Sequence, residues 1–591
     1  MRLYPTRMLD IQPTTRNRKT QSSVKMQTRD PNNTQAWLVG SGISSLAAAL
    51  HLIKDAKVPG PSIHIIDTHN GSGGGMRMQG DEESGYFVPF ECSPHFHGSC
   101  VEKLLSLIPS ETNHETSILD TVHGRGVDKR SAAKLKPEEH HEASHHLPAS
   151  ILDRLFSSSA KYHAPLARFV TTGASGPAVS HHASVHLGLN QRMVLIGFML
   201  EHESAIFNKS VKDIFEAEFF ETEFWMLWST TFGLKPGHSA IEFQRHLRKY
   251  LGDLKSLDRL REHQRTDYNL VESVIKPLTT FLKAQGVDFR FHQQVTDLKA
   301  YPEGGPTTVS QIEVVTEEGA GELITLDPVD ILIVSLGSTS SGAAIGSDLT
   351  PPDALTANWE EVMDGDWMLW EKLAQKSTKF GNPMNFLPRI LEATIETFTT
   401  TFQGPEFNVL YDRITKEKPG TGASLSLGDS NWGVTISIPH QPVFSTQSSE
   451  TTVMLGYALN PAAEGNFVKK EMWRCTGQEI LREVLAHLGC TEDSDEAASI
   501  LATANTIPCG LPLGTAPFLT RGSGDRPPVI PTWTTNIACV GQFVEIPGDT
   551  TLEVDYRVHT AQIAVAELMG LPVPPVKQAR NLLLEVLSVL L

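Results

Sequence analysis

Three small residues with the spacing Gly40-x-Gly42-x-x-Ser45 are the part of this sequence best suited to binding a phosphate ligand. In a dinucleotide-binding turn the first glycine permits the bend and the second lets a pyrophosphate approach the backbone. The third position needs a small side chain for helix–strand packing. A following helix offers unpaired N–H groups to phosphate. Asp67, about 25 residues further on, supplies a carboxylate for ribose hydroxyls, so we predict a nucleotide site.

The elements that must position these residues follow from the local pattern. The apolar runs 36–39 and 63–66 are typical of buried strands. Between them, residues 43–56 contain strong helix formers. Strand, glycine turn, helix and strand in this order form a βαβ unit.

Three further stretches favour FAD as the nucleotide. Gly71 to Gly75 follows the second strand, and the apolar run 330–336 ends at Gly337. The run 537–540 ends at Gly541 and precedes a helix expected at 556–568. A C-terminal strand that returns to an N-terminal βαβ unit is typical of a discontinuous FAD domain. The cofactor-binding residues that we predict are Gly40, Gly42, Ser44, Ser45, Asp67, Gly74, Gly75, Val295, Gly337 and Gly541.

The fold expected for the whole chain is α/β, with a discontinuous Rossmann-like FAD-binding domain, an interposed mixed α+β substrate domain and a C-terminal helix. The FAD-binding domain is assigned to residues 35–120, 266–345 and 533–570. The substrate-binding parts are a helical substrate or lid region, 121–265, and a domain at 346–532. The ends are a disordered basic tail, 1–34, and an apolar helix, 571–591.

Composition excludes several classes of protein. With 68 acidic against 50 basic residues among 591, the formal net charge is −18, which argues against nucleic acid as a partner. Six scattered cysteines are too few for a disulfide-built secreted domain. No apolar run approaches the roughly 18 residues of a membrane span. We expect a soluble cytoplasmic protein, and the basic residues of 1–34 leave a mitochondrial presequence as the alternative.

Several long stretches resemble the oleate hydratase family, also called myosin-cross-reactive antigens. They are GSGISSLAAALHLIKDAKVPG, FHGSC with the SLIPS that follows, FWMLWSTTFGLKPGHSAIEF, GNFVKKEMWRCTGQEIL, GDRP and IACVGQFVEIPGD, in family order from about residue 36 to 568. The resemblance implies an FAD-binding fold with an interposed substrate domain, usually as a homodimer. It also implies addition of water to a cis double bond of a free fatty acid, without net redox change.

The catalytic positions depart from the family pattern. In the family a Glu near the flavin positions the water and a Tyr protonates the alkene. Here Ser93 stands at the Glu position and His246 at the Tyr position. Imidazole titrates near neutrality, so His246 is a candidate acid or base, and Glu91, two residues before Ser93, is a candidate substitute for the lost Glu.

The family's substrate-binding positions are altered as well. Tyr268 and Asn269 match the start of its YNQY segment, but the glutamine is lost. In the family's carboxylate clamp only Ser437 keeps a hydroxyl, and His440 is an unmatched polar substitute nearby. The substrate residues that we predict are Tyr268, Asn269, Ser437 and His440.

These observations favour an FAD-binding hydro-lyase that adds water to an unsaturated fatty acid or a related hydrophobic chain. The main alternative is a non-redox double-bond isomerase or cyclase acting on a polyene or polyketide, which needs an acid and a base but no bound water. A redox-active flavin oxidase or desaturase and a catalytically silent binding flavoprotein are further alternatives.

Two remaining features concern partners. Histidine pairs at 140–146 and 181–186 lack accompanying cysteines or fixed carboxylates, so we predict no metal site. The apolar end of the chain, NLLLEVLSVLL, suits either peripheral contact with a membrane surface or a dimer interface.

Overall fold

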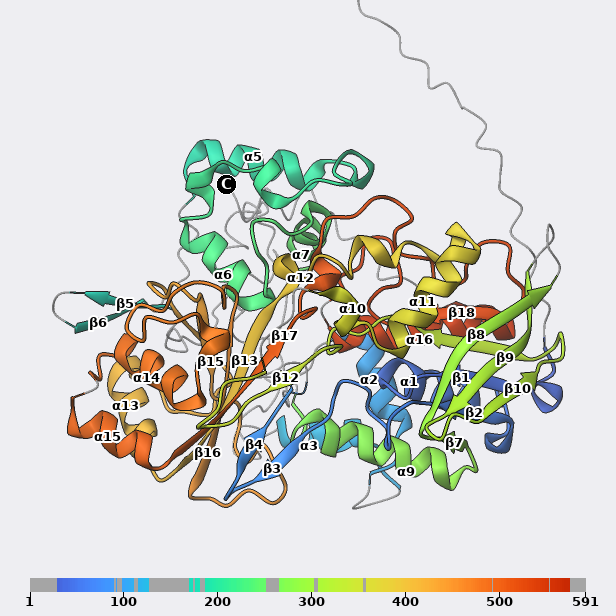
Figure 1. The fold of residues 1–591 in the computed structure, drawn as a ribbon, viewed down its shortest axis with the longest axis horizontal. Helices are drawn as coiled ribbons and strands as arrows, with labels where there is room; N and C mark the ends of the chain where they lie inside the picture. Colours follow the sequence, from blue (N-terminus) through green and yellow to red (C-terminus); the bar gives the residue numbers. More distant parts are fainter. Residues whose placement is uncertain are drawn as a thin grey trace, which may run out of the picture.

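A five-stranded parallel sheet gathers three distant parts of the chain into one layer (Figure 1). In spatial order its strands are β18 (Ile537–Val540), β11 (Ile331–Ser335), β1 (Ala36–Val39), β2 (Ile63–Ile66) and β7 (Asp288–Arg290). Every residue of the central strand β1 is buried, as expected where both faces of a parallel sheet are covered. This computed structural model describes residues 29–89, 92, 98–110, 115–126, 169–173, 176–180, 187–250, 265–301, 307–353, 358–491, 493–551 and 553–573.

Helices cover the parallel sheet close to the ranges expected from the sequence. Helix α1 (Ile43–Lys54) follows the glycine turn, and it packs against α16 (Val554–Met569) and α9 (Lys276–Ala284). Leu46 and Leu50, one turn apart on α1, are fully buried. The expected βαβ unit and the C-terminal strand–helix pair are therefore both present.

A three-stranded antiparallel sheet lies between β7 and β11 in the chain. It consists of β8 (Gln293–Tyr301), β9 (Thr308–Thr316) and β10 (Gly321–Thr325), at the right-hand edge of Figure 1. Helix α11 (Gly365–Lys376) packs on β8, where Lys372 Nζ donates to the Thr296 carbonyl and Lys376 Nζ to the Leu298 carbonyl, both at 2.9 Å. These bonds fasten α11 to the three-stranded sheet.

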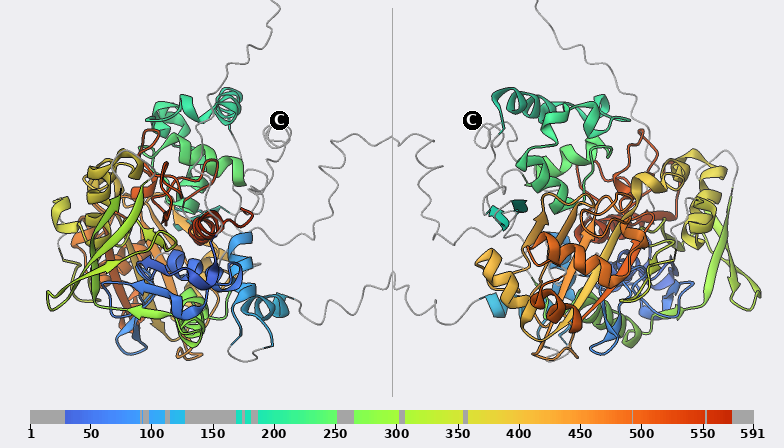
Figure 2. Two further views of the ribbon diagram at one scale, coloured as in Figure 1. Left: turned by 90° about the vertical axis from the view of Figure 1, so that its right-hand side faces the viewer. Right: turned by 60° about the vertical axis from the view of Figure 1, so that its left-hand side comes forward.

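An eight-stranded mixed sheet occupies the opposite end of the long axis (Figures 1 and 2). In spatial order its strands are β12 (Ala344–Ile345), β17 (Ala504–Leu511), β13 (Ile395–Gln403), β16 (Thr451–Ala458), β15 (Val434–Ser437), β14 (Ser424–Leu427), β5 (Phe169–Gly173) and β6 (Gly176–Ser180). Phe398 of β13, Leu410 of α13 (Glu406–Thr415) and Val484 of α14 (Gly477–His487) share one apolar core. The two-stranded hairpin of β3 (Gln79–Asp81) and β4 (Gly85–Phe87) packs against β13 and β17.

A helical layer has its own aromatic core. Helices α5 (Leu189–Leu200), α6 (Glu223–Phe232) and α7 (Ala240–Tyr250) bury a cluster of phenylalanines and tryptophans that includes Phe219, Trp228 and Phe243. The hydroxyl of Tyr457, on β16, donates to the Thr230 carbonyl of α6. This bond ties the helical layer to the eight-stranded sheet.

The fold class expected from the sequence is confirmed, and three details differ from the expected organisation. Arg29, within the segment expected to be disordered, is buried and donates to the Val329 and Thr535 carbonyls at 3.0 and 2.7 Å. Hairpin β5–β6 falls in the region expected to be helical, yet β5 pairs with β14 of the eight-stranded sheet. Helix α11 falls in the expected substrate-binding range but packs on β8.

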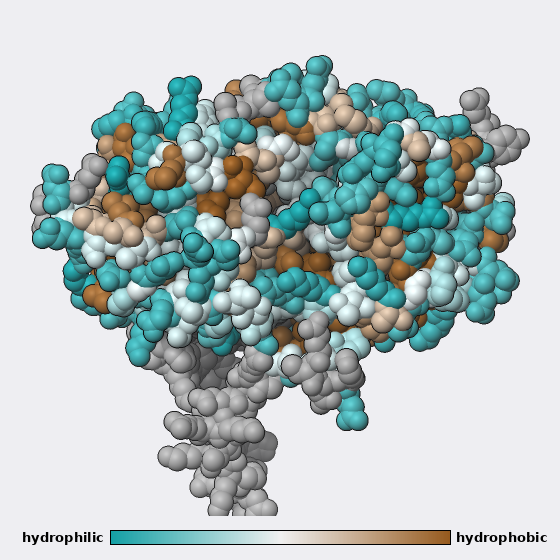
Figure 3. Space-filling model, turned by 60° about the horizontal axis from the view of Figure 1, so that its bottom comes forward, coloured by the Kyte–Doolittle hydropathy of each residue, from teal (hydrophilic) through white to brown (hydrophobic). Residues whose placement is uncertain are grey.

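The described surface is mixed in polarity. On the face shown in Figure 3, apolar residues occur in small groups among polar ones. In the described part of the chain, no helix has the length and apolar character required to cross a bilayer.

Candidate functional site

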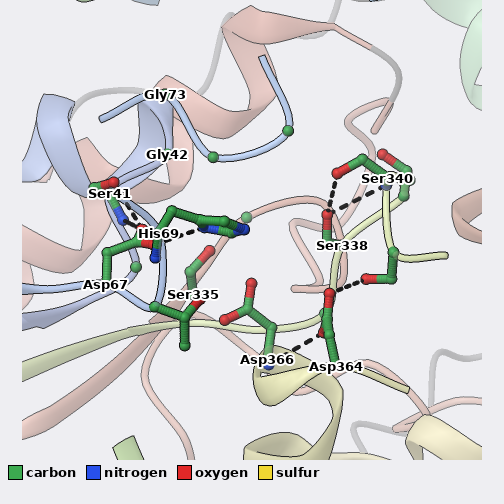
Figure 4. A pocket seen from close by; sticks show the side chains of 18 of the residues that line it. Ser41, Gly42, Asp67, His69, Gly73, Ser335, Ser338, Ser340, Asp364 and Asp366 are labelled. Carbon is green, nitrogen blue, oxygen red and sulfur yellow. Dashed lines mark hydrogen bonds and ion pairs between the residues drawn. The ribbon is translucent and has the colours of Figure 1, made fainter. Parts of the chain in front are cut away.

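A cavity of about 450 Å³ opens at the carboxyl ends of the parallel strands (Figure 4). Its lining includes Val39 at the end of β1, Asp67 after β2, Ser335 at the end of β11 and Gly541 after β18. Ligands of open parallel α/β sheets bind at this edge, where the strand order reverses. The volume lies within the range of small-molecule and cofactor sites.

Nine of the ten residues predicted to bind the cofactor line this one cavity. They are Gly40, Gly42, Ser44, Asp67, Gly74, Gly75, Val295, Gly337 and Gly541. The tenth, Ser45, is fully buried beneath the turn, and its Oγ has no hydrogen-bond partner among the described residues. Residues from four separate stretches of sequence therefore converge on one space.

The glycine turn leaves the start of α1 open to the cavity. Gly40 has φ +89°, a conformation that favours glycine. Gly42 is the N-cap of α1, no side chain caps the first turn, and a Cβ added at Gly42 would meet no atom within 4 Å. The first N–H groups of a helix lack intrahelical partners and attract anions. This geometry suits a phosphate group.

A second glycine-rich loop closes over the first. The Gly73 amide donates to the Ser41 carbonyl at 2.9 Å. Gly74 has φ +58°, and a Cβ at Gly75 would lie 2.3 Å from Ser340 Oγ. Both positions require glycine, because a side chain would strain the backbone at Gly74 or collide with Ser340 at Gly75.

Asp67 clamps the glycine turn to the end of β2. Its Oδ2 accepts bonds from the Ser41 amide and hydroxyl at 2.5 and 2.7 Å. Its Oδ1 accepts bonds from the His69 amide and Nδ1 at 2.8 and 2.7 Å. Burial raises the pKa of Asp67, while the bonds from Ser41 act in the opposite direction.

Sequence reasoning missed the N-terminus of α11, which lines the same cavity. Asp364 caps this helix, and its Oδ2 accepts a bond from Ser341 Oγ at 2.5 Å. The Asp366 carboxylate points into the space between Asp67 and Ser338 (Figure 4). Burial and the neighbouring carboxylates Asp364 and Asp67 raise the pKa of Asp366 well above its usual value. The local sequence Asp-Gly-Asp-Trp signals a helix start but not a cavity.

The far end of the cavity reaches the eight-stranded sheet. Its lining there consists of Thr397 of β13, Cys509 and Leu511 of β17, Phe87 at the end of β4 and Pro89 after it. Thr397 Oγ1 donates to the Cys509 carbonyl at 3.3 Å, and burial raises the pKa of the Cys509 thiol to about 12. The cavity therefore joins the two large sheets, with an apolar, uncharged wall at this end.

The structure brings the two predicted substrate segments together. The backbone N–H and Nδ2 of Asn269 both donate to the Val443 carbonyl at 2.9 Å. Ser437 Oγ donates to the Gly422 carbonyl at 3.1 Å, and His440 is half-buried in the loop that follows β15. Tyr268 is half-buried directly before Asn269. None of the four predicted residues is in the lining of the cavity.

Of the three predicted catalytic residues, two lie outside the described part of the chain: Glu91 and Ser93. Between them, the Cys92 carbonyl accepts a bond from the Leu270 amide at 3.2 Å. Cys92 itself is therefore held next to the segment that carries Asn269.

His246 lies in the core of the helical layer. It is fully buried on α7, against Phe232 of α6 and Phe518. Its Nδ1 lies 2.7 Å from the Glu242 carbonyl oxygen, so Nδ1 carries a proton and donates it. Nε2 has no hydrogen-bond partner among the described residues, and burial lowers the pKa of His246. A neutral imidazole held in this way has the chemistry to accept a proton at Nε2, but His246 is not among the residues that line the cavity.

Among the described residues, His, Cys, Asp and Glu form no group of three or more that could hold a metal ion. The histidine pairs at 140–146 and 181–186 lie outside those residues.

A parallel sheet with a glycine-rich turn, a clamping aspartate after β2 and a C-terminal strand–helix return define a Rossmann-like α/β protein, here extended by a mixed sheet that shares its cavity. The model of the MCRA family matches residues 33–566, and the chain belongs to this family.

Two hydratases are similar to the chain over most of its length. The chain is 29% identical over 542 residues to the oleate hydratase of Streptococcus pyogenes serotype M49 (strain NZ131), covering 90% of this chain and 85% of the relative. It is 25% identical over 562 residues to the linoleate hydratase of Lactiplantibacillus plantarum, covering 91% and 94%. Among solved structures, cyclohexylamine oxidase from Brevibacterium oxydans IH-35A aligns with a TM-score of 0.48 at 12% identity, covering 91% of this chain and 99% of the other.

Proposed function

We propose that the protein is an FAD-binding hydro-lyase that adds water to a double bond of an unsaturated fatty acid or a related hydrophobic chain. The observation that carries this proposal is the match, over about nine-tenths of the chain, to relatives named oleate hydratase and linoleate hydratase. A free fatty acid suits the apolar end of the cavity, which is lined by Phe87 and Leu511.

FAD fits the cavity from the glycine turn to the second sheet. The uncapped first turn of α1 is suited to the pyrophosphate, and Gly42 leaves room for its approach. An extended dinucleotide can place its adenosine near β2 and its flavin near Gly541 and Thr397, which line the same space. When bound, the flavin supplies a polar, rigid wall to the active site without net redox change.

His246 is the candidate general base. Because its Nδ1 donates to the Glu242 carbonyl, the neutral ring has only Nε2 free to accept a proton from a water or hydroxyl group. The aromatic rings of Phe232 and Phe518 hold the imidazole in place. Glu91 and Ser93 remain proposed partners in positioning the water.

One observation favours isomerisation as the second candidate function. Isomerisation needs an acid and a base but no bound water, and one imidazole can act first as the base and then, once protonated, as the acid. His246 has one buried ring nitrogen without a hydrogen-bond partner among the described residues, which suits that double role. A polyene or polyketide is the corresponding substrate class.

Incubation of the FAD-loaded protein with oleate and with a conjugated polyene in ¹⁸O-water distinguishes these reactions by mass spectrometry. Hydration adds labelled water to oleate. Unchanged mass with shifted double bonds establishes isomerisation instead. Bleaching of the flavin by substrate under anaerobic conditions would contradict both and indicate a redox enzyme.

His246→Asn tests the assigned base. We expect at least a 100-fold loss of turnover with FAD loading and melting temperature retained, because removal of a general base commonly costs 10² to 10⁴-fold. The matched control is His238→Asn, a second fully buried histidine, which bonds to the Lys235 amide through Nδ1 at 3.0 Å. Equal turnover in His246→Asn and wild type removes His246 from the mechanism.

We further propose a homodimer, and peripheral membrane contact through residues 571–591. Both follow from the family resemblance and the apolar sequence of the C-terminus. Light scattering of the purified protein tests the dimer. Sedimentation with phosphatidylglycerol vesicles, before and after deletion of residues 574–591, tests the membrane contact.

A further inference from the structure

Asp67 has no acceptor position left for a ribose. A carboxylate offers about four lone-pair sites, and Asp67 uses four on its bonds from the amide and hydroxyl of Ser41 and the amide and Nδ1 of His69. The sequence pattern assigns ribose binding to this residue, whereas the structure commits it to holding the glycine turn. A second acceptor is needed if the adenosine hydroxyls are to be bound.

Asp366 is the carboxylate in the described lining that faces the cavity without a hydrogen-bond commitment. Asp364, two residues before it, accepts bonds from Ser341 Oγ and from the Asp366 and Trp367 amides. No described residue donates a hydrogen bond to the side chain of Asp366, which points into the space between Asp67 and Ser338 (Figure 4). The carboxyl group of Asp366 therefore remains available to accept hydrogen bonds from a ligand.

The position of Asp366 is fixed by rigid elements. It lies in the first turn of α11, where the neighbouring Gly365 packs so closely on Gln294 that a Cβ would lie 2.9 Å from Nε2. Lys372 and Lys376 fasten the same helix to β8. Gln294 and Val295, at the start of β8, line the cavity beside it. A side chain held in this way is preorganised for a ligand.

We propose that Asp366 accepts the ribose hydroxyls of the adenosine half of the dinucleotide, in place of the saturated Asp67. This inference rests on the proposed FAD binding, which it deepens by naming the residue that reads the adenosine. The side-chain carboxyl group of Asp366 can accept a hydrogen bond from a hydroxyl group whether or not the carboxyl is ionised.

The direction in which a substitution of Asp366 changes FAD affinity separates this role from simple charge repulsion. FAD carries a negatively charged diphosphate, so loss of a nearby carboxylate charge strengthens FAD binding or leaves it unchanged if Asp366 acts only through its charge. Loss of a hydrogen-bond acceptor weakens binding instead. Bonds to the two ribose hydroxyls, at about 0.5–1.5 kcal/mol each, together correspond to roughly 5- to 150-fold in affinity.

The test compares FAD affinity of Asp366→Ala, Glu371→Gln and the wild type by quenching of flavin fluorescence. Glu371→Gln removes a carboxylate charge from the same helix at a residue outside the lining of the cavity. We expect Asp366→Ala to weaken FAD binding by at least 10-fold and Glu371→Gln to change it by less than 3-fold. Unchanged or tighter binding in Asp366→Ala overturns the proposal.

Competition by ADP and by 2′,3′-dideoxy-ADP identifies the group that Asp366 reads. We expect Asp366→Ala to weaken the binding of ADP at least 10-fold. Its affinity for the dideoxy compound should stay within 3-fold of the wild-type value. Equal weakening of both compounds overturns the ribose assignment. Wild-type protein that binds no FAD defeats the proposed function itself, whereas wild-type binding with no effect of Asp366→Ala defeats only this inference.

Discussion

Asn269 contacts Val443 twice, because its backbone amide and its side-chain amide both donate to the same carbonyl oxygen at 2.9 Å. The two residues are 174 positions apart in the chain. Asn269 Oδ1 also accepts a bond from the Glu272 amide at 2.9 Å. One fully buried side chain therefore fixes the start of a helix and joins two segments that the family resemblance assigns to substrate binding.

Asn269→Ala is expected to lower the free energy of unfolding by about 1–3 kcal/mol, because it removes two side-chain bonds and leaves the half-buried Glu272 amide without its acceptor. Ser437→Ala is the control, since it loses a single half-buried bond to the Gly422 carbonyl and should cost under about 1 kcal/mol. Urea denaturation of both variants measures the difference. Equal effects would contradict the special position of Asn269.

Gly42→Ala separates cofactor binding from folding. The protein itself leaves open space at Gly42, so we expect the free energy of unfolding without cofactor to change by less than about 1 kcal/mol. FAD affinity should fall at least 10-fold, because the added methyl group occupies the path of the pyrophosphate. Gly40→Ala is the contrast, with strain of about 1–3 kcal/mol at φ +89° even without cofactor. Normal FAD affinity in Gly42→Ala would exclude the assigned approach.

The sequence allowed accurate prediction where a structure is determined by neighbours in the chain. The βαβ unit at 36–67 follows from short apolar runs and a glycine turn, and the strand–helix pair after residue 537 follows from the same pattern. Hairpin β5–β6 was not predicted, because its pairing with β14 depends on residues more than 250 positions away. Pairing at such separation leaves no local pattern.

The residues of the site also separate into those that the local sequence predicted and those that depend on distant packing. The glycines were found because their spacing or their clustering signals a close approach of the backbone to a ligand. Asp366 was missed because an aspartate in the first turn of a helix is usual in any protein, and its place in the cavity depends on the packing of α11 against β8. His246 was selected by family position, and its tautomer became apparent only from its distance to the Glu242 carbonyl.

Glu242→Gln should be strongly destabilising. Glu242 Oε1 lies 2.8 Å from Arg521 and 3.2 Å from Arg526, and all three side chains are buried. Removal of the carboxylate leaves buried guanidinium charge without this partner, at a cost of about 3–5 kcal/mol. Arg413→Ala, which breaks the more exposed pair with Glu496, should cost under about 1 kcal/mol. Similar melting temperatures for the two variants would contradict this expectation.

The pH dependence of turnover reports on His246. Burial lowers the pKa of this imidazole below its usual 6.5, so the ring stays neutral and able to accept a proton through the neutral range. We expect kcat/KM to stay level as the pH falls from 8 to 6.5 and to decline only below that value, as His246 becomes protonated. A decline centred above pH 6.5 would assign the acid limb to another group.

Glu396 makes stability depend on pH in the opposite direction from a salt-bridged carboxylate. It is fully buried on β13, neither oxygen has a hydrogen-bond partner among the described residues, and burial raises its pKa to about 8. The folded protein therefore holds a proton that the unfolded chain releases near pH 4.5, so this group lowers stability progressively as the pH rises from 4.5 to about 8.

Glu396→Gln removes this dependence of stability on pH. We expect the variant to gain stability over wild type by a few kcal/mol (about 1.4 per pKa unit) at pH 8 and little at pH 5. Urea denaturation at both pH values measures this difference. An equal difference in the free energy of unfolding between variant and wild type at pH 5 and pH 8 would show that Glu396 titrates normally.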